Sequence, residues 1–256
     1  MRDATLPDLT GRGVLVTGAS GQVGRGIALR FAAAGAVVAA HGNDHGHDVE
    51  SLVEHIRAQG GSAVAVLADL RDEAGCRHAV ETAAAWLGSL DVLVNAAGVQ
   101  PVQDLGSMTD GMWREVVDTN LTSVFRCTRF AAELMPRPGG SIVHIGSIEG
   151  TQPAPGHAHY CSSKAAVIMH ARAAALEYGR FGIRVNSVSP GLIERPGLDR
   201  SWPEGVGRWR RAAPLRRLGR GEDVGDACVF LASPMASWIT GHDLRVDGGV
   251  SAHPTW

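Results

Sequence analysis

Tyr160 and Lys164 are the two residues whose types and spacing point most directly to chemistry. They are four positions apart in a segment with helical periodicity, so their side chains share one helix face. A phenol has an ordinary pKa of about 10 and must become more acidic to donate a proton near neutral pH. An ammonium group within about 4–6 Å favours the phenolate. The pair therefore predicts an acid–base site near the start of this helix.

Two further polar residues are expected to complete this site. Ser147 follows a short apolar strand, where its hydroxyl can hydrogen-bond a carbonyl oxygen and hold it against Tyr160. Asn120, on the helix after the preceding strand, can anchor a water molecule beside Lys164. A ketone that accepts a hydride needs an acid to protonate its oxygen. These residues predict hydride transfer to or from a secondary carbinol carbon.

A glycine-rich turn before the first long helix predicts where a dinucleotide binds. Glycine permits positive φ and close ligand approach, and a helix N-terminus offers unsatisfied amides with partial positive charge. We expect the pyrophosphate to lie against the turn residues Gly18, Ser20, Gly21, Gln22, Val23 and Gly24.

The end of the second predicted strand indicates which nicotinamide cofactor fits. An NAD site places an acidic residue about twenty residues beyond the glycines, whereas this strand ends with His41 and Asn43. A site without that acid tolerates a 2′-phosphate, with Arg25, His41 or His45 as positive partners. NADP is therefore the predicted cofactor. NAD remains the alternative, because the carboxylate of Asp44 can replace the missing acid.

Short strands rich in valine and alanine alternate with helical segments along the whole chain, and these elements must position the candidate site. The predicted strands are 14–17, 37–40, 63–68, 92–95, 141–145, 183–188 and 243–246. The predicted helices are 22–34, 48–59, 73–87, 113–134, 158–178 and 223–231. Strands that are apolar on both faces belong in a parallel sheet covered by helices on each side.

The predicted fold class is therefore α/β, as a single doubly wound (Rossmann) domain over residues 1–256 with a seven-stranded parallel sheet. Ligands are expected beyond the carboxyl ends of the strands. Asp69, just after the third strand, can accept a hydrogen bond from an adenine amino group. The segment around 194–220, rich in arginine, tryptophan, glycine and proline, breaks the alternation and is expected to be a substrate lid.

Composition narrows the class of partner. The net charge of −2 offers no general attraction to nucleic acid or anionic lipid. No apolar run approaches the roughly 20 residues of a membrane span. The four cysteines are widely spaced without a CxxC pair. We expect a cytoplasmic protein with a small-molecule substrate, with neither nucleic acid nor membrane as a partner and without a metal site.

The ordered set of motifs resembles the short-chain dehydrogenase/reductase family over essentially the whole chain. The motifs are TGASGQVG at 17–24, NAAG at 95–98, YCSSK at 160–164, RVNSVSPG at 184–191 and ITGHDLRVDGG at 239–249. The spacing from Ser147 to Tyr160 looks like that of the family's 3-oxoacyl-[acyl-carrier-protein] reductases. The resemblance implies a catalytic tetrad of Asn120, Ser147, Tyr160 and Lys164, in which Tyr160 is the acid/base.

The resemblance also implies further cofactor contacts. With Asp69, the expected set is Leu70, Asn95, Ala96, Gly98, Tyr160, Lys164, Pro190, Gly191 and Ile193. Two positions depart from the family pattern. Gln22 stands where most members of this subgroup have the middle glycine, and Arg195 stands where a threonine often contacts the nicotinamide amide.

The substrate is less defined than the reaction. Contacts are expected from Ser147, Glu149, His157 and Tyr160. The main hypothesis is a ketone or 3-oxoacyl reductase, for which the arginine-rich lid can attract an acidic acyl carrier protein. Polar residues after Ser147 favour the alternative of a sugar or polyol dehydrogenase. A non-catalytic dinucleotide-binding module and a sugar epimerase are further alternatives. The family implies a homotetramer assembled through the helices 113–134 and 158–178.

Overall fold

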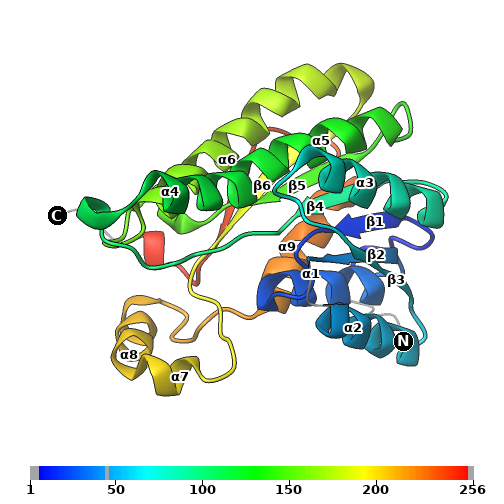
Figure 1. Ribbon diagram of the computed structural model, residues 1–256. Coiled ribbons are helices and arrows are strands. Elements are labelled where there is room, and N and C mark those ends of the chain that lie inside the picture. The colour runs from blue at the N-terminus through cyan, green and yellow to red at the C-terminus, as the bar shows by residue number, and fades with distance from the viewer. Residues whose placement is uncertain (1–5, 44–45, 253–256) are drawn as a thin grey trace.

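Seven parallel strands form the centre of the protein. The computed structural model describes residues 6–43 and 46–252 and has helices on both faces of one sheet (Figure 1). The strand order is β3-β2-β1-β4-β5-β6-β7, which confirms the predicted doubly wound α/β fold. The strands are β1 (Gly13–Val16), β2 (Val37–Gly42), β3 (Ser62–Leu67), β4 (Val92–Asn95), β5 (Ser141–Ile145), β6 (Arg184–Pro190) and β7 (Asp243–Val246).

Two helical layers enclose the sheet. One layer consists of α1 (Gln22–Ala33), α2 (Gly46–Ala58) and α9 (Gly221–Ala232), and the other contains α3 (Glu73–Leu87), α4 (Asp110–Val117), α5 (Ser123–Leu134) and α6 (Ala158–Tyr178). Two short helices, α7 (Leu198–Ser201) and α8 (Pro203–Ala212), lie away from the sheet in the predicted lid segment. Among the described residues, no helix has the length and apolar character needed to span a membrane.

The sheet separates two apolar cores, because successive strand residues point to opposite faces. Val14 and Val16 pack in the core beneath α1, α2 and α9, whereas Leu15 packs in the core beneath α3, α5 and α6. Burial on both faces explains why these strands are apolar throughout instead of alternating with polar residues.

The helix predicted over 113–134 differs from the observed one. It begins at Asp110, and a π-helical turn over Asp118–Thr122 separates α4 from α5. Such a turn holds one extra residue, and it is frequent at functional sites. The smaller differences are at element ends, for example in β6, which continues to Pro190 instead of ending at residue 188.

The contact between α1 and α9 depends on a glycine in each helix. A Cβ on Gly26 would lie 2.2 Å from the carbonyl carbon of Gly221. The two backbones touch, and this contact fixes the helix that begins at the glycine-rich turn.

We expect Gly26→Ala to destabilise the protein by about 1–3 kcal/mol, because the added methyl group overpacks this contact. Gly179→Ala is the matched control, since Gly179 has a φ of −55° and a Cβ there would contact nothing in the described part of the chain. Urea denaturation measures both free energies of unfolding. Equal losses in the two variants would contradict the role given to the α1–α9 contact.

Candidate active site

The predicted acid–base residues lie together beyond the carboxyl end of β5. Tyr160 and Lys164 are in the first two turns of α6, and Ser147 lies two residues beyond the end of β5 in extended conformation. The side chain of Ser147 lies close enough to the phenol of Tyr160 to lower the pKa of that phenol. Lys164 Nζ lies 5.6 Å from the centre of the Tyr160 ring and donates a hydrogen bond of 2.8 Å to the carbonyl oxygen of Ile145.

Asn120 reaches the same site from the π-helical turn. Its side chain accepts a hydrogen bond from the amide of Val99 (2.8 Å) and donates one to the carbonyl of Val99 (2.9 Å). A Cβ on Gly98 would lie 3.2 Å from Asn120 Oδ1 and 3.5 Å from Lys164 Nζ. Gly98 therefore leaves the space that these two polar groups share.

Burial sets the proton affinity of both central groups. Burial raises the pKa of Tyr160 to about 12, although the side chain of Ser147 lowers it; the charge of Glu149 raises it further. Burial also lowers the pKa of Lys164 to about 8. Both shifts favour the uncharged forms. Lys164 can consequently exchange a proton near neutral pH, as a proton relay requires.

Raising the pH should stabilise the wild-type protein relative to a Lys164→Met variant. The pKa of Lys164 is about 8 in the folded protein and 10.5 in the reference state. Between these values the unfolded chain binds the extra proton, so the wild type gains up to about 1.4 kcal/mol per pH unit. Urea denaturation of both proteins from about pH 7.5 to about pH 9.5 measures this difference. A difference that does not change with pH would show that Lys164 keeps an ordinary pKa.

The glycine-rich turn packs tightly against the loop that follows β4. Gly18 has a φ of +64°, and a Cβ there would lie 2.6 Å from the Cα of Ala97. Thr17 Oγ1 accepts hydrogen bonds from the amides of Ala96 (3.0 Å) and Ala97 (3.1 Å). No side chain of the described residues caps α1 at Gly21. The first amides of α1 can therefore bind an anion. Thr17, missed as a contact from sequence, was marked by its place just before the glycines.

His41 does not provide the positive charge that was expected beside a 2′-phosphate. Its side chain is almost fully buried, and burial lowers its pKa. Nδ1 accepts a hydrogen bond from the amide of Gly18 (3.2 Å), so Nε2 carries the proton that is donated to the carbonyl of Ala68 (3.0 Å). The neutral ring thus joins the glycine turn to the end of β3. Asn43 is exposed, whereas Asp44 and His45 lie outside the described residues.

Several predicted cofactor residues have side chains engaged within the protein. The carboxylate of Asp69 binds Arg71 in a forked ion pair, with contacts of 2.6 and 2.9 Å to one oxygen. The side chain of Leu70 is in the core. The side-chain amide of Asn95 forms hydrogen bonds with His144 (3.1 Å) and Thr128 (3.3 Å). These side chains mainly shape the strand ends.

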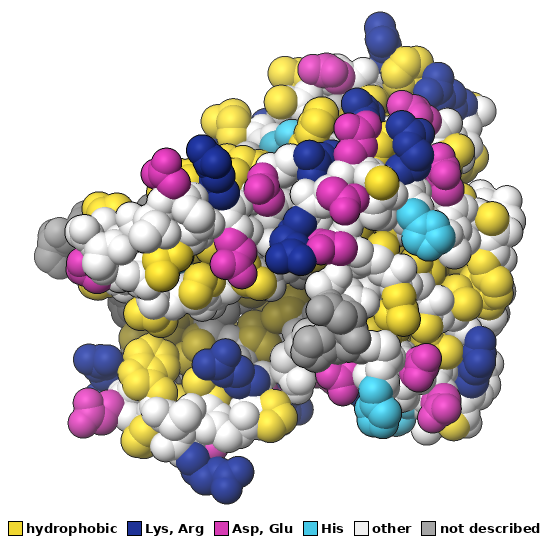
Figure 2. Space-filling model, in the orientation of Figure 1, with side chains coloured by type: hydrophobic (Ala, Val, Ile, Leu, Met, Phe, Trp, Pro, Cys, Tyr) yellow, Lys and Arg dark blue, Asp and Glu magenta, His cyan; other side chains and the backbone are white. Residues whose placement is uncertain are grey.

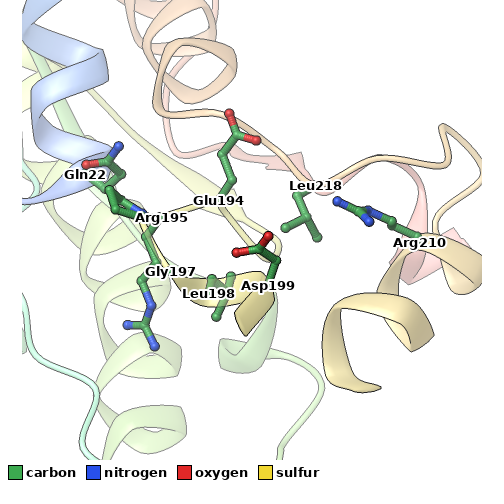
Figure 3. A pocket seen from close by; sticks show the side chains of 9 residues that line it. Gln22, Glu194, Arg195, Gly197, Leu198, Asp199, Arg210 and Leu218 are labelled. Carbon is green, nitrogen blue, oxygen red and sulfur yellow. The ribbon is translucent and has the colours of Figure 1, made fainter. Parts of the chain in front are cut away.

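The lid segment borders a cleft next to the glycine turn. The cleft has a volume of about 400 Å³ and is lined by Gln22 and by residues of the lid segment, among them Arg195, Asp199 and Arg210 (Figure 3). Gly191 packs against Trp209, whose Cζ2 would lie 2.6 Å from a Cβ at Gly191. Ile193 pairs with Gly219 beyond Pro190, the last residue of β6. The molecular surface is hollowed between the lid and the body (Figure 2).

The expected substrate residues differ in where they face. His157 Nδ1 lies 2.8 Å from Glu149 Oε2, near the phenol of Tyr160. The neighbouring His159, which was not among them, is completely buried, and its Nδ1 accepts a hydrogen bond from the amide of Tyr160. Gln100, which hydrogen-bonds Glu149, was missed from the sequence. Its position two residues after the NAAG motif was the available signal.

A glycine-rich turn, a parallel sheet and an adjacent tyrosine–lysine–serine group define a dinucleotide-dependent oxidoreductase. Residues 18–251 match the family model described as enoyl-(acyl carrier protein) reductase. A 3-oxoacyl-[acyl-carrier-protein] reductase of Staphylococcus aureus is 37% identical over 240 residues, which cover 93% of this chain and 98% of the relative. Glucose 1-dehydrogenase 2 of Bacillus subtilis is 34% identical over 97% of this chain and 98% of its own.

Solved structures agree with these relatives. A short-chain alcohol dehydrogenase from Sinorhizobium meliloti has a TM-score of 0.92 at 35% identity, covering 96% of this chain and 99% of its own. A short-chain dehydrogenase from Burkholderia cenocepacia, solved with NADP, has a TM-score of 0.88 at 32% identity, covering 95% and 99%. The chain belongs to the short-chain dehydrogenase/reductase family.

Proposed function

We propose that this protein transfers hydride between NADP and a secondary alcohol or ketone, as a ketone or 3-oxoacyl reductase. The observation that carries the proposal is the convergence of Asn120, Ser147, Tyr160 and Lys164 beyond the carboxyl end of the sheet. Ser147 binds the substrate oxygen, and Tyr160 donates or accepts its proton. Lys164 relays the proton, because burial brings its pKa to about 8, while Asn120 stabilises the loop at Val99 and anchors water.

The cofactor would bind along the glycine turn and the loop that follows β4, where it would supply or accept the hydride. The close backbone contacts at Gly18 and Gly98 fit a ligand that approaches the main chain. At the end of β2, the described residues Gly42 and Asn43 carry no charge, and a Cβ on Gly42 would lie 3.7 Å from Ser20 Oγ. This neutral end and the NADP-bound relative favour NADP over NAD.

Separate titrations with NADPH and NADH should show tighter binding of NADPH. Wild-type protein should then oxidise NADPH with ketones or 3-oxoacyl thioesters, whereas Tyr160→Phe should lose at least about 100-fold in turnover and still bind NADPH, because it lacks only the proton donor. Fluorescence measures binding, and absorbance measures turnover. NADPH binding without wild-type turnover across the panel would instead favour a non-catalytic module.

Oxidation of sugars or polyols is the second candidate function. The polar pair Glu149–His157 beside Tyr160 and the similarity to a glucose dehydrogenase support it. Preference for NADH with activity on sugars alone would favour this function over a biosynthetic reductase.

The lid and the helix surfaces suggest how the protein meets its partners. The segment around 194–220 would cover the substrate, and its exposed arginines would attract an acyl carrier protein if the substrate is a thioester. Phe125 on α5 and Met169 and Leu176 on α6 are exposed apolar residues. We assign this face to a homotetramer of a cytoplasmic enzyme.

Light scattering should give four times the 26.8 kDa mass of one chain. Leu176→Glu should reduce that mass, since the charge would be buried between copies. Leu67→Glu is the control, because Leu67 is also exposed but lies on the edge strand β3. A monomeric wild type would overturn the assignment.

A further inference from the structure

Glu149 is a carboxylate on which side chains from three other parts of the chain converge. Its Oε2 lies 2.8 Å from His157 Nδ1 and accepts a weaker contact of 3.7 Å from Cys161 Sγ. Its Oε1 accepts a hydrogen bond of 3.1 Å from Gln100 Nε2. The side chains of Glu149 and His157 are 20% and 17% exposed, respectively. The pair is therefore held firmly and is still accessible.

The pair borders the space next to the groups that would hold the substrate oxygen. The amide of Glu149 donates to Ser147 Oγ (3.1 Å). The ring of His157 stands edge-on to that of Tyr160, with the ring centres 6.1 Å apart. Because Nδ1 faces Glu149, Nε2 points away from the carboxylate, and no described residue hydrogen-bonds it. Nδ1 donates to the carboxylate, so Nε2 is an acceptor in the neutral ring and a donor in the protonated ring.

We propose that His157, held by Glu149, binds a second oxygen atom of the substrate. This inference rests on the proposed function and extends it to a substrate class. The substrate carries an oxygen on the first or second carbon from the carbon that exchanges hydride. In a 2-hydroxy ketone this oxygen is the hydroxyl group, and in a 3-oxoacyl ester or thioester it is the acyl carbonyl oxygen. The hydroxyl group can donate to Nε2 of the neutral ring, and either oxygen can accept from Nε2 of the protonated ring.

Three substrates of equal chain length test this inference. They are a 3-oxo ester, a 2-hydroxy ketone, and a plain ketone in which a methylene group replaces the carbon group that bears the second oxygen. The wild type should prefer at least one oxygenated substrate in kcat/KM by about 3- to 100-fold, the range from a neutral to a charged hydrogen bond. His157→Leu should collapse this ratio, mainly through a higher KM for the oxygenated substrate. His47→Gln, at a position 96% exposed on α2, should leave the ratio unchanged.

The Glu149→Gln variant removes the negative charge but keeps a side-chain oxygen that can accept a hydrogen bond from His157 Nδ1. Glu149 is a positioning residue. The Glu149→Gln variant should therefore lower the same preference, but it should raise the KM for the oxygenated substrate less than His157→Leu does. It should also move the alkaline limb of the pH–rate profile to lower pH, since the charge of Glu149 raises the pKa of Tyr160. The other titratable groups near this phenol are Lys164, Cys161 and His157.

The outcomes separate this inference from the proposed function. Equal wild-type rates on all three substrates would overturn the role of His157 but leave the reductase function intact. A preference that survives both His157→Leu and Glu149→Gln would also overturn it. No turnover of any substrate by the cofactor-bound wild type would overturn both. A preference lost in the two variants supports the inference, and the preferred oxygenated substrate identifies the class.

Discussion

The burial of a lysine ammonium group beside a tyrosine is the constraint on which the site depends. Removing a charge from water is costly unless polar partners replace the solvent. The carbonyl of Ile145, at the end of β5, supplies one partner to Lys164. Gly98 contributes no side chain, so the ammonium lies near Asn120. The strand end, the loop after β4 and the π-helical turn must therefore all be in place before Lys164 can be buried.

Close backbone contacts also hold together the loops at the carboxyl edge of the sheet. Gly18 touches Ala97, while Thr17 binds the amides of that loop. His41 adds a neutral bridge from the glycine turn to the end of β3. The ends of four strands, β1, β2, β3 and β4, are thus joined by short polar contacts. The dinucleotide site and the proton-transfer site share one rigid support, as hydride transfer over a short distance requires.

The Glu149–His157 pair contrasts with this buried support. It is polar, partly exposed and adjacent to Ser147 and Tyr160, whereas Trp209 fixes the lid by packing on Gly191. A family with one reaction mechanism can accept different substrates by changing such peripheral residues. The Glu149–His157 pair is peripheral in this sense, since it is partly exposed while Lys164 and Asn120 are buried.

Local patterns in the sequence determined the order of strands and helices, the glycine turn and the pairing of Tyr160 with Lys164, because these follow from periodicity and short spacings. Tertiary structure alone decided the state of His41, because burial of its ring lowers the pKa and favours the neutral form. It also decided the inward bonds of Asn95 and the joining of Gln100, Glu149 and His157. These contacts connect residues that are distant in sequence, so only the complete fold brings them together.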